Sequence, residues 1–330
     1  MLNPTQKLNS KLFDKDVERI PIRKGFGEGL LQAGEENPQV VGLCADLTES
    51  TQMHLFRDKF PERFIELGVA EQNLASVASG MSAMGKIPFI TSYAMFSPGR
   101  NWEQIRTTIC YNDRHVVIAG SHAGVSVGPD GGTHQAIEDI ALMRVVPNMT
   151  VISPCDAVEA KKATLASVGL RTPVYIRLVR EKTPVMTTSE SPFVVGKANV
   201  LFDTEKEKID VGIIATGALV YKALKVAKAC EEKGMSVSVL NVHTIKPLDE
   251  EAVLSLAQRA KGLVTVEEHQ ITGGLGGAVA EYLSGVHPTY IERVGVKNLF
   301  GQSGTPDELI EHYEMGEKAI MKAMEKVIQK

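Results

Sequence analysis

Residues 115–135 have the sequence HVVIAGSHAGVSVGPDGGTHQ, in which a short apolar run, His115–Ala119, ends in a glycine-rich segment. A continuous run of apolar, β-branched residues predicts a strand that is buried on both faces. Residues 121–135 contain too few apolar side chains to pack as a regular element, so we predict a loop at the end of this strand. Because ligands of α/β sheets bind beyond the carboxyl ends of the strands, this loop is a candidate functional site.

Apolar runs of the same kind recur along the chain and alternate with stretches of helical spacing. This alternation predicts parallel sheets covered by helices, and hence an α/β fold of two consecutive α/β sandwich domains. The predicted strands are Val40–Leu43, Phe64–Leu67, Ile87–Ile90, His115–Ala119, Thr150–Ser153, Pro173–Leu178, Val211–Ala215, Ser236–Asn241 and Leu263–Glu267. The predicted helices are Gly27–Ala33, Gln72–Met84, Trp102–Ile109, Ala136–Met143, Ala157–Ser167, Ala218–Lys233, Asp249–Ala260, Leu275–Leu283 and Thr305–Val327.

The domain boundary is predicted from a change in composition. The segment Val185–Gly196, VMTTSESPFVVG, is rich in Thr, Ser and Pro, and the strand–helix rhythm restarts after it. We therefore expect a polar N-terminal arm at 1–15, a first domain at 16–185, a linker at 186–196 and a second domain at 197–330.

Composition and charge exclude several classes of protein. The formal net charge of −4 does not favour non-specific nucleic-acid binding. No apolar run reaches the roughly 18 residues that a transmembrane helix needs, and the N-terminus has no apolar secretory core. The four cysteines are far apart and form no CxxC pair. We interpret them as ordinary buried thiols and expect a cytoplasmic protein that binds neither nucleic acid nor membrane.

Three further groups of side chains follow predicted strands. Glu71 comes at the start of a predicted helix, where a carboxylate suits the helix dipole or serves chemistry. Tyr93 and Phe96 follow the Ile87–Ile90 strand and either stack a planar ligand or belong to the core. His122, Asp130 and His134 lie on the glycine-rich loop, where they can hydrogen-bond hydroxyls and move protons. Their spacing is not that of a zinc site.

The common phosphate and nucleophile motifs are missing or incomplete. The glycine runs at 25–29 and 273–277 do not complete G-x-G-x-x-G, and no Walker sequence is present. A Rossmann oxidoreductase is therefore poorly supported. The absence of a G-x-S-x-G elbow disfavours a hydrolase.

Taken together, the segments resemble the C-terminal half of transketolase, and closely the smaller subunit of a two-chain transketolase. The resemblance runs from about residue 20 to the end and covers a pyrimidine-binding thiamine diphosphate domain and a transketolase C-terminal domain. The motifs that carry it are Cys44–Thr48 (CADLT), Gly68–Glu71 (GVAE), Gly128–Gln135 (GPDGGTHQ) and Phe300–Glu308 (FGQSGTPDE). Of these, GPDGGTHQ is the most specific.

The resemblance implies a role for each candidate residue. Glu71 matches the glutamate that hydrogen-bonds N1′ of the thiamine aminopyrimidine and so promotes loss of the thiazolium C2 proton. Tyr93 and Phe96 match the aromatic residues that enclose the pyrimidine. The catalytic set is then Glu71, His122 and His134. The substrate-binding positions are Arg23, Ser50, His122, Asp130, His134 and Arg180, with Arg23, Ser50 and Arg180 matching the phosphate-binding positions.

The chain departs from the full-length family pattern in two ways. Ala70, Gln72, Gly99 and Ala123 stand where many relatives have Arg, His, an aromatic residue and Asp, and these positions bear on sugar preference and cofactor affinity. The sequence also contains no Gly-Asp-Gly, the motif that holds Mg²⁺ and the diphosphate in thiamine enzymes. The resemblance therefore implies no metal ligand in this chain. It also implies a partner, the N-terminal transketolase subunit, that carries the diphosphate-binding domain.

The implied activity is a ketol transfer of the pentose phosphate pathway, in which a two-carbon unit passes from a ketose phosphate to an aldose phosphate. Closed symmetry favours two copies of each chain, an α2β2 heterotetramer. Two alternatives remain open. One is a subunit of another thiamine enzyme, similar to 1-deoxyxylulose-5-phosphate synthase or to a 2-oxoacid dehydrogenase β chain. The other is a binding subunit that has kept the fold without the chemistry.

Overall fold

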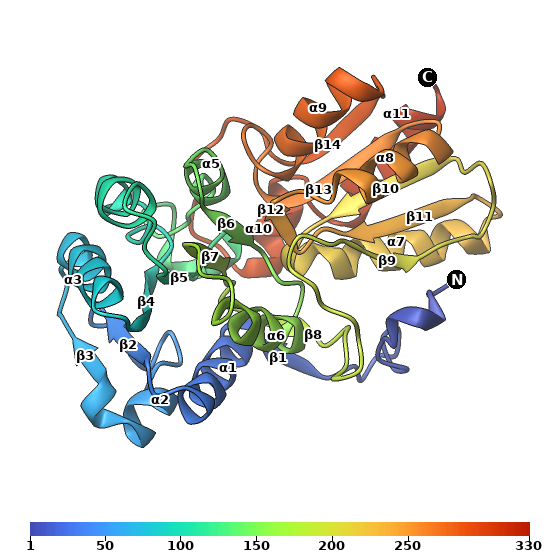
Figure 1. The fold of residues 1–330 in the computed structure, drawn as a ribbon. Helices are drawn as coiled ribbons and strands as arrows, with labels where there is room; N and C mark the ends of the chain where they lie inside the picture. The colour runs from blue at the N-terminus through green and yellow to red at the C-terminus, as the bar shows by residue number, and fades with distance from the viewer.

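The computed structural model describes residues 1–330, which form two α/β units that lie side by side (Figure 1). A seven-stranded sheet forms the centre of the first unit and a five-stranded sheet the centre of the second. A two-stranded ribbon of β1 (Arg19–Pro21) and β8 (Lys182–Pro184) lies outside both sheets. The prediction of two consecutive α/β sandwich domains is confirmed.

The first sheet is parallel except at one edge. Its order is β12 (Thr244–Lys246), β6 (Thr150–Ile152), β7 (Val174–Arg177), β5 (Val117–Ser121), β4 (Ile87–Tyr93), β2 (Val40–Cys44) and β3 (Phe64–Glu66). Only the pairing of β12 with β6 is antiparallel. Every residue of β2 and β5 is buried, because helices cover both faces of these strands.

The second sheet is arranged in the same way. Its order is β14 (Ile291–Val296), β13 (Leu263–Gln270), β10 (Val211–Ala215), β11 (Val237–Asn241) and β9 (Asn199–Phe202). The edge strand β9 is antiparallel to β11, and the other pairings are parallel. The carboxyl end of β13 points toward the first unit, which brings Glu267–Gln270 close to the glycine-rich loop.

Helices cover both sheets. Those of the first unit are α1 (Ile22–Glu36), α2 (His54–Lys59), α3 (Glu71–Ala83), α4 (Trp102–Gln104), α5 (Asp139–Arg144) and α6 (Ala157–Ser167). Those of the second are α7 (Val220–Glu232), α8 (Glu250–Arg259), α9 (Leu275–Val286), α10 (Pro306–His312) and α11 (Glu317–Ile328). The glycine run at 25–29 lies inside α1, where a Cβ on Gly25 would come within 1.8 Å of the Ala157 carbonyl oxygen. These glycines allow α1 and α6 to pack closely.

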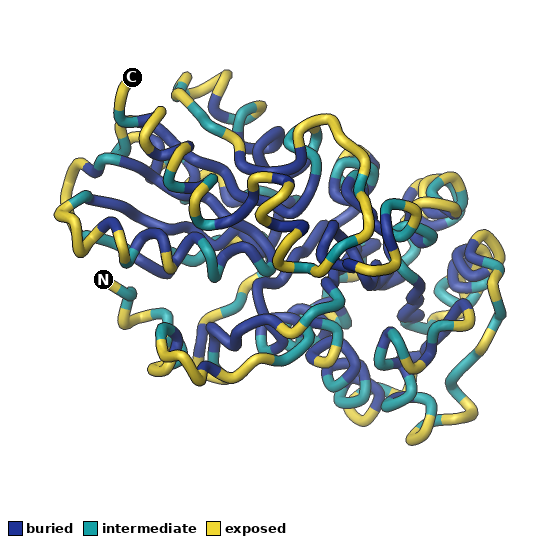
Figure 2. The backbone as a smooth tube through the Cα atoms, turned by 180° about the vertical axis from the view of Figure 1, so that it is seen from behind, coloured by how far each residue is buried: buried dark blue, intermediate teal, exposed yellow.

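One of the apolar core clusters spans the two units. Strand β12 follows the second unit's β11 in the chain but pairs with β6 of the first sheet. A cluster of 31 buried residues includes Val41 and Ile118 of the first sheet and Ile214 and Leu240 of the second. Figure 2 shows the buried backbone running through both sheets and between them. The units are therefore held together by apolar burial as well as by strand pairing.

The N-terminal arm is in contact with the second unit. The backbone amide of Asn3 donates to the Leu201 carbonyl at 2.9 Å. Leu12 is fully buried in a core cluster made mainly of second-unit residues. Figure 1 shows this segment beside β9. The Thr188 hydroxyl also donates to the Lys7 carbonyl at 2.7 Å, so the arm contacts the predicted linker too.

Three details of the predicted secondary structure are wrong. The single helix expected at Thr305–Val327 is two helices, α10 and α11, separated by a turn in which Glu314 has a positive φ of 54°. The helix expected at Trp102–Ile109 is one turn of α4 followed by a π-helix at Ile105–Cys110. Strands β1, β8, β9, β12 and β14 were not predicted. β1 and β8 are three-residue strands that pair only with each other, β9 and β12 are antiparallel edge strands, and β14 is polar at its start.

All four cysteines are buried and free, as the interpretation of ordinary thiols predicts. None of the helices combines the length and apolarity needed to cross a membrane.

Candidate active site

Glu71 is the first residue of α3, directly after the turn that follows β3. Its side chain is 3 % exposed, and its Oε2 atom is buried without a hydrogen-bond partner. Asn101 holds the backbone of Glu71, because its side-chain amide donates to the Glu71 carbonyl oxygen at 2.9 Å. A buried carboxylate without a partner is costly, so the geometry indicates a carboxylate kept for a ligand.

Two hollows flank Glu71. One of about 240 Å³ is lined by Glu71, Phe96 and Arg100 together with Ala45, Asp46, Leu47 and Val69. The other, of about 630 Å³, is lined by Glu71, Arg100 and the exposed Gln72, with Val69, Ala70, Asn73, Ser76 and Gln104. Glu71 thus lines space that it shares with Phe96 and Arg100.

The predicted aromatic residues form one cluster with the two predicted histidines. The ring centroids of Tyr93 and His122 are 3.9 Å apart and the rings are stacked, while Tyr93 and Phe96 are 6.3 Å apart. His134 meets the edge of Phe96 at 5.4 Å and of Tyr93 at 6.4 Å. Because Phe96 lines the hollow beside Glu71, this cluster connects the carboxylate to the glycine-rich loop.

The two predicted phosphate-binding arginines lie next to His122. Arg23 Nη1 is 3.2 Å from His122 Nε2, and Arg180 Nη1 donates to the Val127 carbonyl at 3.0 Å. Burial and the charge of Arg180 lower the pKa of Arg23. Burial, followed by the charges of Arg23 and Arg180, lowers the pKa of His122 to about 3. Two cations held this close favour an anionic ligand between or beside them.

The hydrogen bonds of His122 fix its tautomer. A neutral imidazole has one N–H donor and one acceptor nitrogen. Since the Arg23 guanidinium can only donate, Nε2 is the acceptor and Nδ1 carries the proton that it donates to the Ser121 hydroxyl at 2.8 Å. His122 also has a positive φ of 56°, which turns its side chain back toward Tyr93 at the end of β5.

The glycine-rich loop begins with a 3₁₀ segment at Val125–Asp130. The last residue of the loop, the buried Gln135, is bonded to the start of this segment, because its side-chain amide donates to the Val125 carbonyl at 3.1 Å. Asp130 is exposed and has no hydrogen-bond partner within the chain. His134 is half-buried, and its Nδ1 is 2.9 Å from the Thr133 hydroxyl.

The structure thus brings together most of the predicted site residues. Arg23, Tyr93, Phe96, His122 and His134 are joined by direct contacts, and the charge of Arg180 acts on Arg23 and His122. Glu71 adjoins them through the hollow that it shares with Phe96. Two residues are not joined in this way. Ser50 is half-buried in the turn before α2 without a hydrogen bond to this cluster, and Asp130 lies on the exposed part of its loop.

Sequence reasoning missed three residues that shape the site: Arg100, Asn101 and Ser121. Arg100 lines both hollows, Asn101 holds the Glu71 carbonyl and Ser121 bonds His122. Arg100 and Asn101 follow β4, and Ser121 ends β5 and begins the glycine-rich segment. Their positions at the carboxyl ends of these strands were the available signal.

Two of the departures from the family pattern have a structural reason. A Cβ added to Gly99 would lie 1.8 Å from the Met95 carbonyl oxygen, so this turn leaves no room for an aromatic side chain there. Ala123 is fully buried in a small cluster with Ala94 and Ala136, where a carboxylate would be costly. No three His, Cys, Asp or Glu side chains lie close enough together to hold a metal ion.

Comparison with known proteins identifies the two units. Residues 18–186 match the model of the transketolase pyrimidine-binding domain, and residues 196–320 match that of the transketolase C-terminal domain. A protein of Methanocaldococcus jannaschii named as a transketolase C-terminal section is 41 % identical over 94 % of this chain and 96 % of its own. The 6-deoxy-6-sulfo-D-fructose transketolase subunit SqwH of a Clostridium species is 37 % identical over 96 % of this chain and 98 % of its own.

Among solved structures, a split-gene transketolase described as an inactive β4 tetramer superposes with a TM-score of 0.87. It is 42 % identical, and the match covers 94 % of this chain and 99 % of that chain. Both domain models, the related chains and this solved fold point to one family. The chain therefore belongs to the transketolase family and comprises its pyrimidine-binding and C-terminal domains.

Proposed function

We propose that this chain is the C-terminal subunit of a two-chain, thiamine diphosphate-dependent transketolase. The observation that carries the proposal is the buried, unpartnered carboxylate of Glu71 beside Phe96, with imidazoles and arginines next to it. The reaction transfers a two-carbon ketol unit from a ketose phosphate to an aldose phosphate (EC 2.2.1.1), and we place it in the pentose phosphate pathway of the cytoplasm.

The residues fit the pyrimidine end of thiamine diphosphate. The free Oε2 of Glu71 supplies a hydrogen-bond acceptor for N1′, and Phe96 and Tyr93 supply ring faces for an aromatic heterocycle. When bound, the cofactor supplies a carbon nucleophile and an electron sink for cleavage and formation of the carbon–carbon bond. Glu71 would hold a proton at N1′.

The remaining residues suit a sugar phosphate. Arg23 and Arg180 bind the phosphate, and Ser50 adds a hydroxyl if the ligand extends to its turn. With a pKa of about 3, His122 is neutral near pH 7, so it hydrogen-bonds the substrate without adding a third positive charge. His134 and Asp130 bind hydroxyls, and His134 accepts or returns their protons.

The partner in this proposal is an N-terminal transketolase subunit that holds the diphosphate and Mg²⁺ in an α2β2 assembly. Three features support it: the absence of a Gly-Asp-Gly motif, the absence of a three-ligand metal cluster, and the related chain described as an inactive β4 tetramer. An active site at the interface between the two subunits would complete the half that this chain provides.

The test of the proposed function is a donor assay with the assembled complex. The chain is co-expressed with its partner and supplied with thiamine diphosphate, Mg²⁺ and an aldose phosphate acceptor. Transfer from xylulose 5-phosphate is the expected result. Use of pyruvate instead would indicate a synthase or dehydrogenase subunit, and the sulfonated sugar named for one relative is a useful third donor.

The loop residues provide a prediction about specificity. Replacing Asp130 by Ala or Asn is expected to lower kcat/KM for the sugar phosphates and to leave thiamine diphosphate affinity unchanged, because Asp130 is exposed and contacts no cofactor-facing residue. His134→Ala is expected to act in the same direction, with a small effect on the cofactor because His134 touches Phe96. Cofactor titration and sugar kinetics are measured on the same preparations. Unchanged sugar kinetics with weaker cofactor binding would place the loop at the cofactor instead.

Arg180 provides a prediction about the phosphate. Arg180→Ala is expected to raise KM for xylulose 5-phosphate by about tenfold or more, since a hydrogen bond to a charged group contributes about 1.5–3 kcal/mol. An unphosphorylated ketose is the matched control and should lose much less. Arg180→Lys keeps the positive charge, so its KM for xylulose 5-phosphate should lie between that of the parent and that of Arg180→Ala. Equal losses for both donors would contradict phosphate binding by Arg180.

A further inference from the structure

The glycine-rich loop is held from behind by a carboxylate of the C-terminal domain. Glu268 lies in β13 and is 4 % exposed. Its Oε1 accepts a hydrogen bond of 2.7 Å from the backbone amide of Ser126, which is in the 3₁₀ segment of the loop. This bond joins two residues that are 142 positions apart in the chain, so the second domain directly fixes the first domain's loop.

The fit around Glu268 is tight. Gly124 has a φ of 86°, a conformation that favours glycine, and a Cβ at this position would lie 2.2 Å from Glu268 Oε1. The loop therefore approaches the carboxylate as closely as only a glycine permits. The other end of the loop is held by the same region, because the Gln270 amide donates to the Ile137 carbonyl at 2.8 Å.

A buried ion pair lies next to Glu268 and holds its backbone. Burial raises the pKa of Glu268, and the nearby Arg177 acts in the opposite direction. The Arg177 guanidinium is itself buried, donates to the Glu268 carbonyl oxygen at 2.8 Å and pairs with Asp139 at 2.9 Å. Buried charges that are paired in this way hold their neighbours in one arrangement, because separating them leaves an uncompensated charge.

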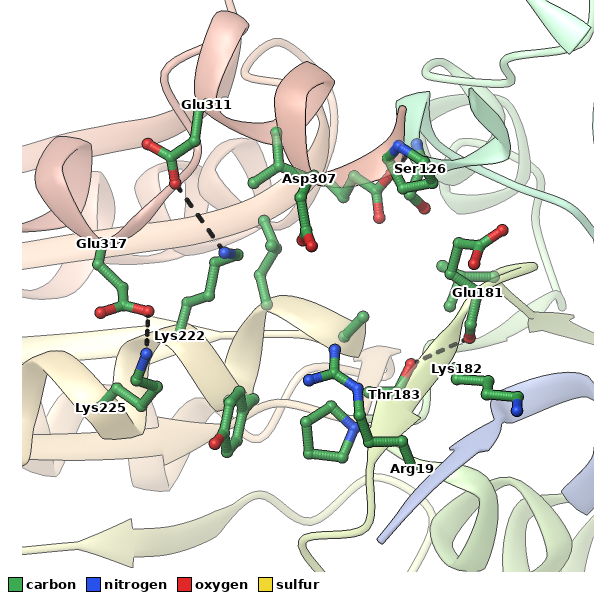
Figure 3. Close-up of a pocket in the computed structure, with 18 residues that line it drawn as sticks. Arg19, Ser126, Glu181, Lys182, Thr183, Lys222, Lys225, Asp307, Glu311 and Glu317 are labelled. Carbon is green, nitrogen blue, oxygen red and sulfur yellow. Dashed lines mark hydrogen bonds and ion pairs between the residues drawn. The ribbon is translucent and has the colours of Figure 1, made fainter. Parts of the chain in front are cut away.

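Glu268 and Ser126 also line a cavity of about 370 Å³ between the two domains. Lys222, Lys225, Glu311 and Glu317 gather at one end of this cavity, and Ser126 and Glu181 lie at the other (Figure 3). The 3₁₀ segment also packs against the start of α10, where a Cβ on Gly128 would lie 3.2 Å from Pro306 Cδ. The hydrogen bond from Ser126 to Glu268 is the direct link between this segment and β13.

We propose that Glu268 is a positioning residue, which fixes the loop backbone so that Asp130 and His134 are presented to the sugar. The kinetic part of this inference rests on the proposed ketol-transferase function. The structural part, an ordered loop that depends on Glu268, does not. A displacement of binding groups by about 1 Å can lower a rate by about 10²-fold, so a loosened loop has a measurable effect.

The experiment compares three variants with the parent chain. Glu268→Ala removes the acceptor, Glu268→Gln retains a neutral acceptor oxygen, and Glu281→Gln alters an exposed glutamate that joins the domains through Arg144 away from the loop. Amide hydrogen exchange is measured on the chain alone, and sugar kinetics and exchange of the cofactor C2 proton on the complex with its partner.

In Glu268→Ala we expect faster exchange confined to residues 121–135 and a 10–100-fold lower kcat/KM for the sugar, with C2 proton exchange unchanged. Glu268→Gln should restore much of the parent's slow amide exchange and much of its kcat/KM. Glu281→Gln should match the parent in both measurements. Parent-like exchange in Glu268→Ala would overturn the proposal. Faster amide exchange across both sheets in Glu268→Ala that is not reversed in Glu268→Gln would also overturn the proposal. If the parent complex transfers no ketol unit, the proposed function fails, while loop exchange still decides the role of Glu268.

Discussion

Glu71→Ala is expected to lower ketol transfer by the assembled enzyme by about 10²–10⁴-fold, the usual contribution of a positioned general acid or base. The reason is the carboxylate's place, buried at the start of α3 with Oε2 unpartnered, in a residue that lines a hollow with Phe96. Without it, N1′ of the cofactor loses its proton partner, and exchange of the cofactor C2 proton should slow in parallel. Both rates are measured on the same complex, the second by NMR.

Stability separates this role from a structural one. An unpartnered buried carboxylate costs folding free energy, so Glu71→Ala and Glu71→Gln should unfold at temperatures no lower than the parent chain. The exposed Glu62→Gln is the matched control and should change neither rate. Near-full ketol transfer and C2 exchange in Glu71→Ala would contradict the assignment, and a large loss of thermal stability would show that Glu71 supports the fold.

Much of the first sheet could be predicted because its strands are buried on both faces. β2 and β5 consist of continuous apolar or small residues, a pattern that local sequence reveals. The strands that were missed depend on contacts distant in sequence. β12 is three residues long and is defined by pairing with β6, about 90 positions earlier, which no local pattern indicates.

The site shows the same division between local and distant signals. Glu71 and His122 follow strands and Tyr93 ends β4, so their residue types and positions were enough to single them out. The low pKa of His122 could not be predicted, because it depends on burial and on Arg23 and Arg180, which come from α1 and from the segment after β7. Glu268 was missed for the same reason, since its partner Ser126 is in the other domain.

The second large effect concerns the chain without its partner, which is expected to show no ketol transfer. The chain offers an acceptor and ring faces for the aminopyrimidine and cations for a sugar phosphate, yet it contains no Gly-Asp-Gly and no three-ligand metal cluster. A diphosphate carries several negative charges and needs a metal or a cationic cradle. Held by its pyrimidine alone, the cofactor would not keep its thiazolium C2 against N1′.

The measurement uses the purified chain with thiamine diphosphate and Mg²⁺, followed by addition of the partner subunit. Alone, the chain should bind the cofactor weakly, with an affinity that does not depend on Mg²⁺, and transfer no ketol unit. Adding the partner should produce activity in proportion to a complex of two copies of each chain, seen by light scattering. Because Glu71→Ala removes only one active-site side chain of this chain, the variant should still assemble with the partner. It should gain little ketol-transfer activity when it does. Tight, Mg²⁺-dependent binding and full turnover by the chain alone would refute the two-chain proposal, since a single chain would then hold both ends of the cofactor.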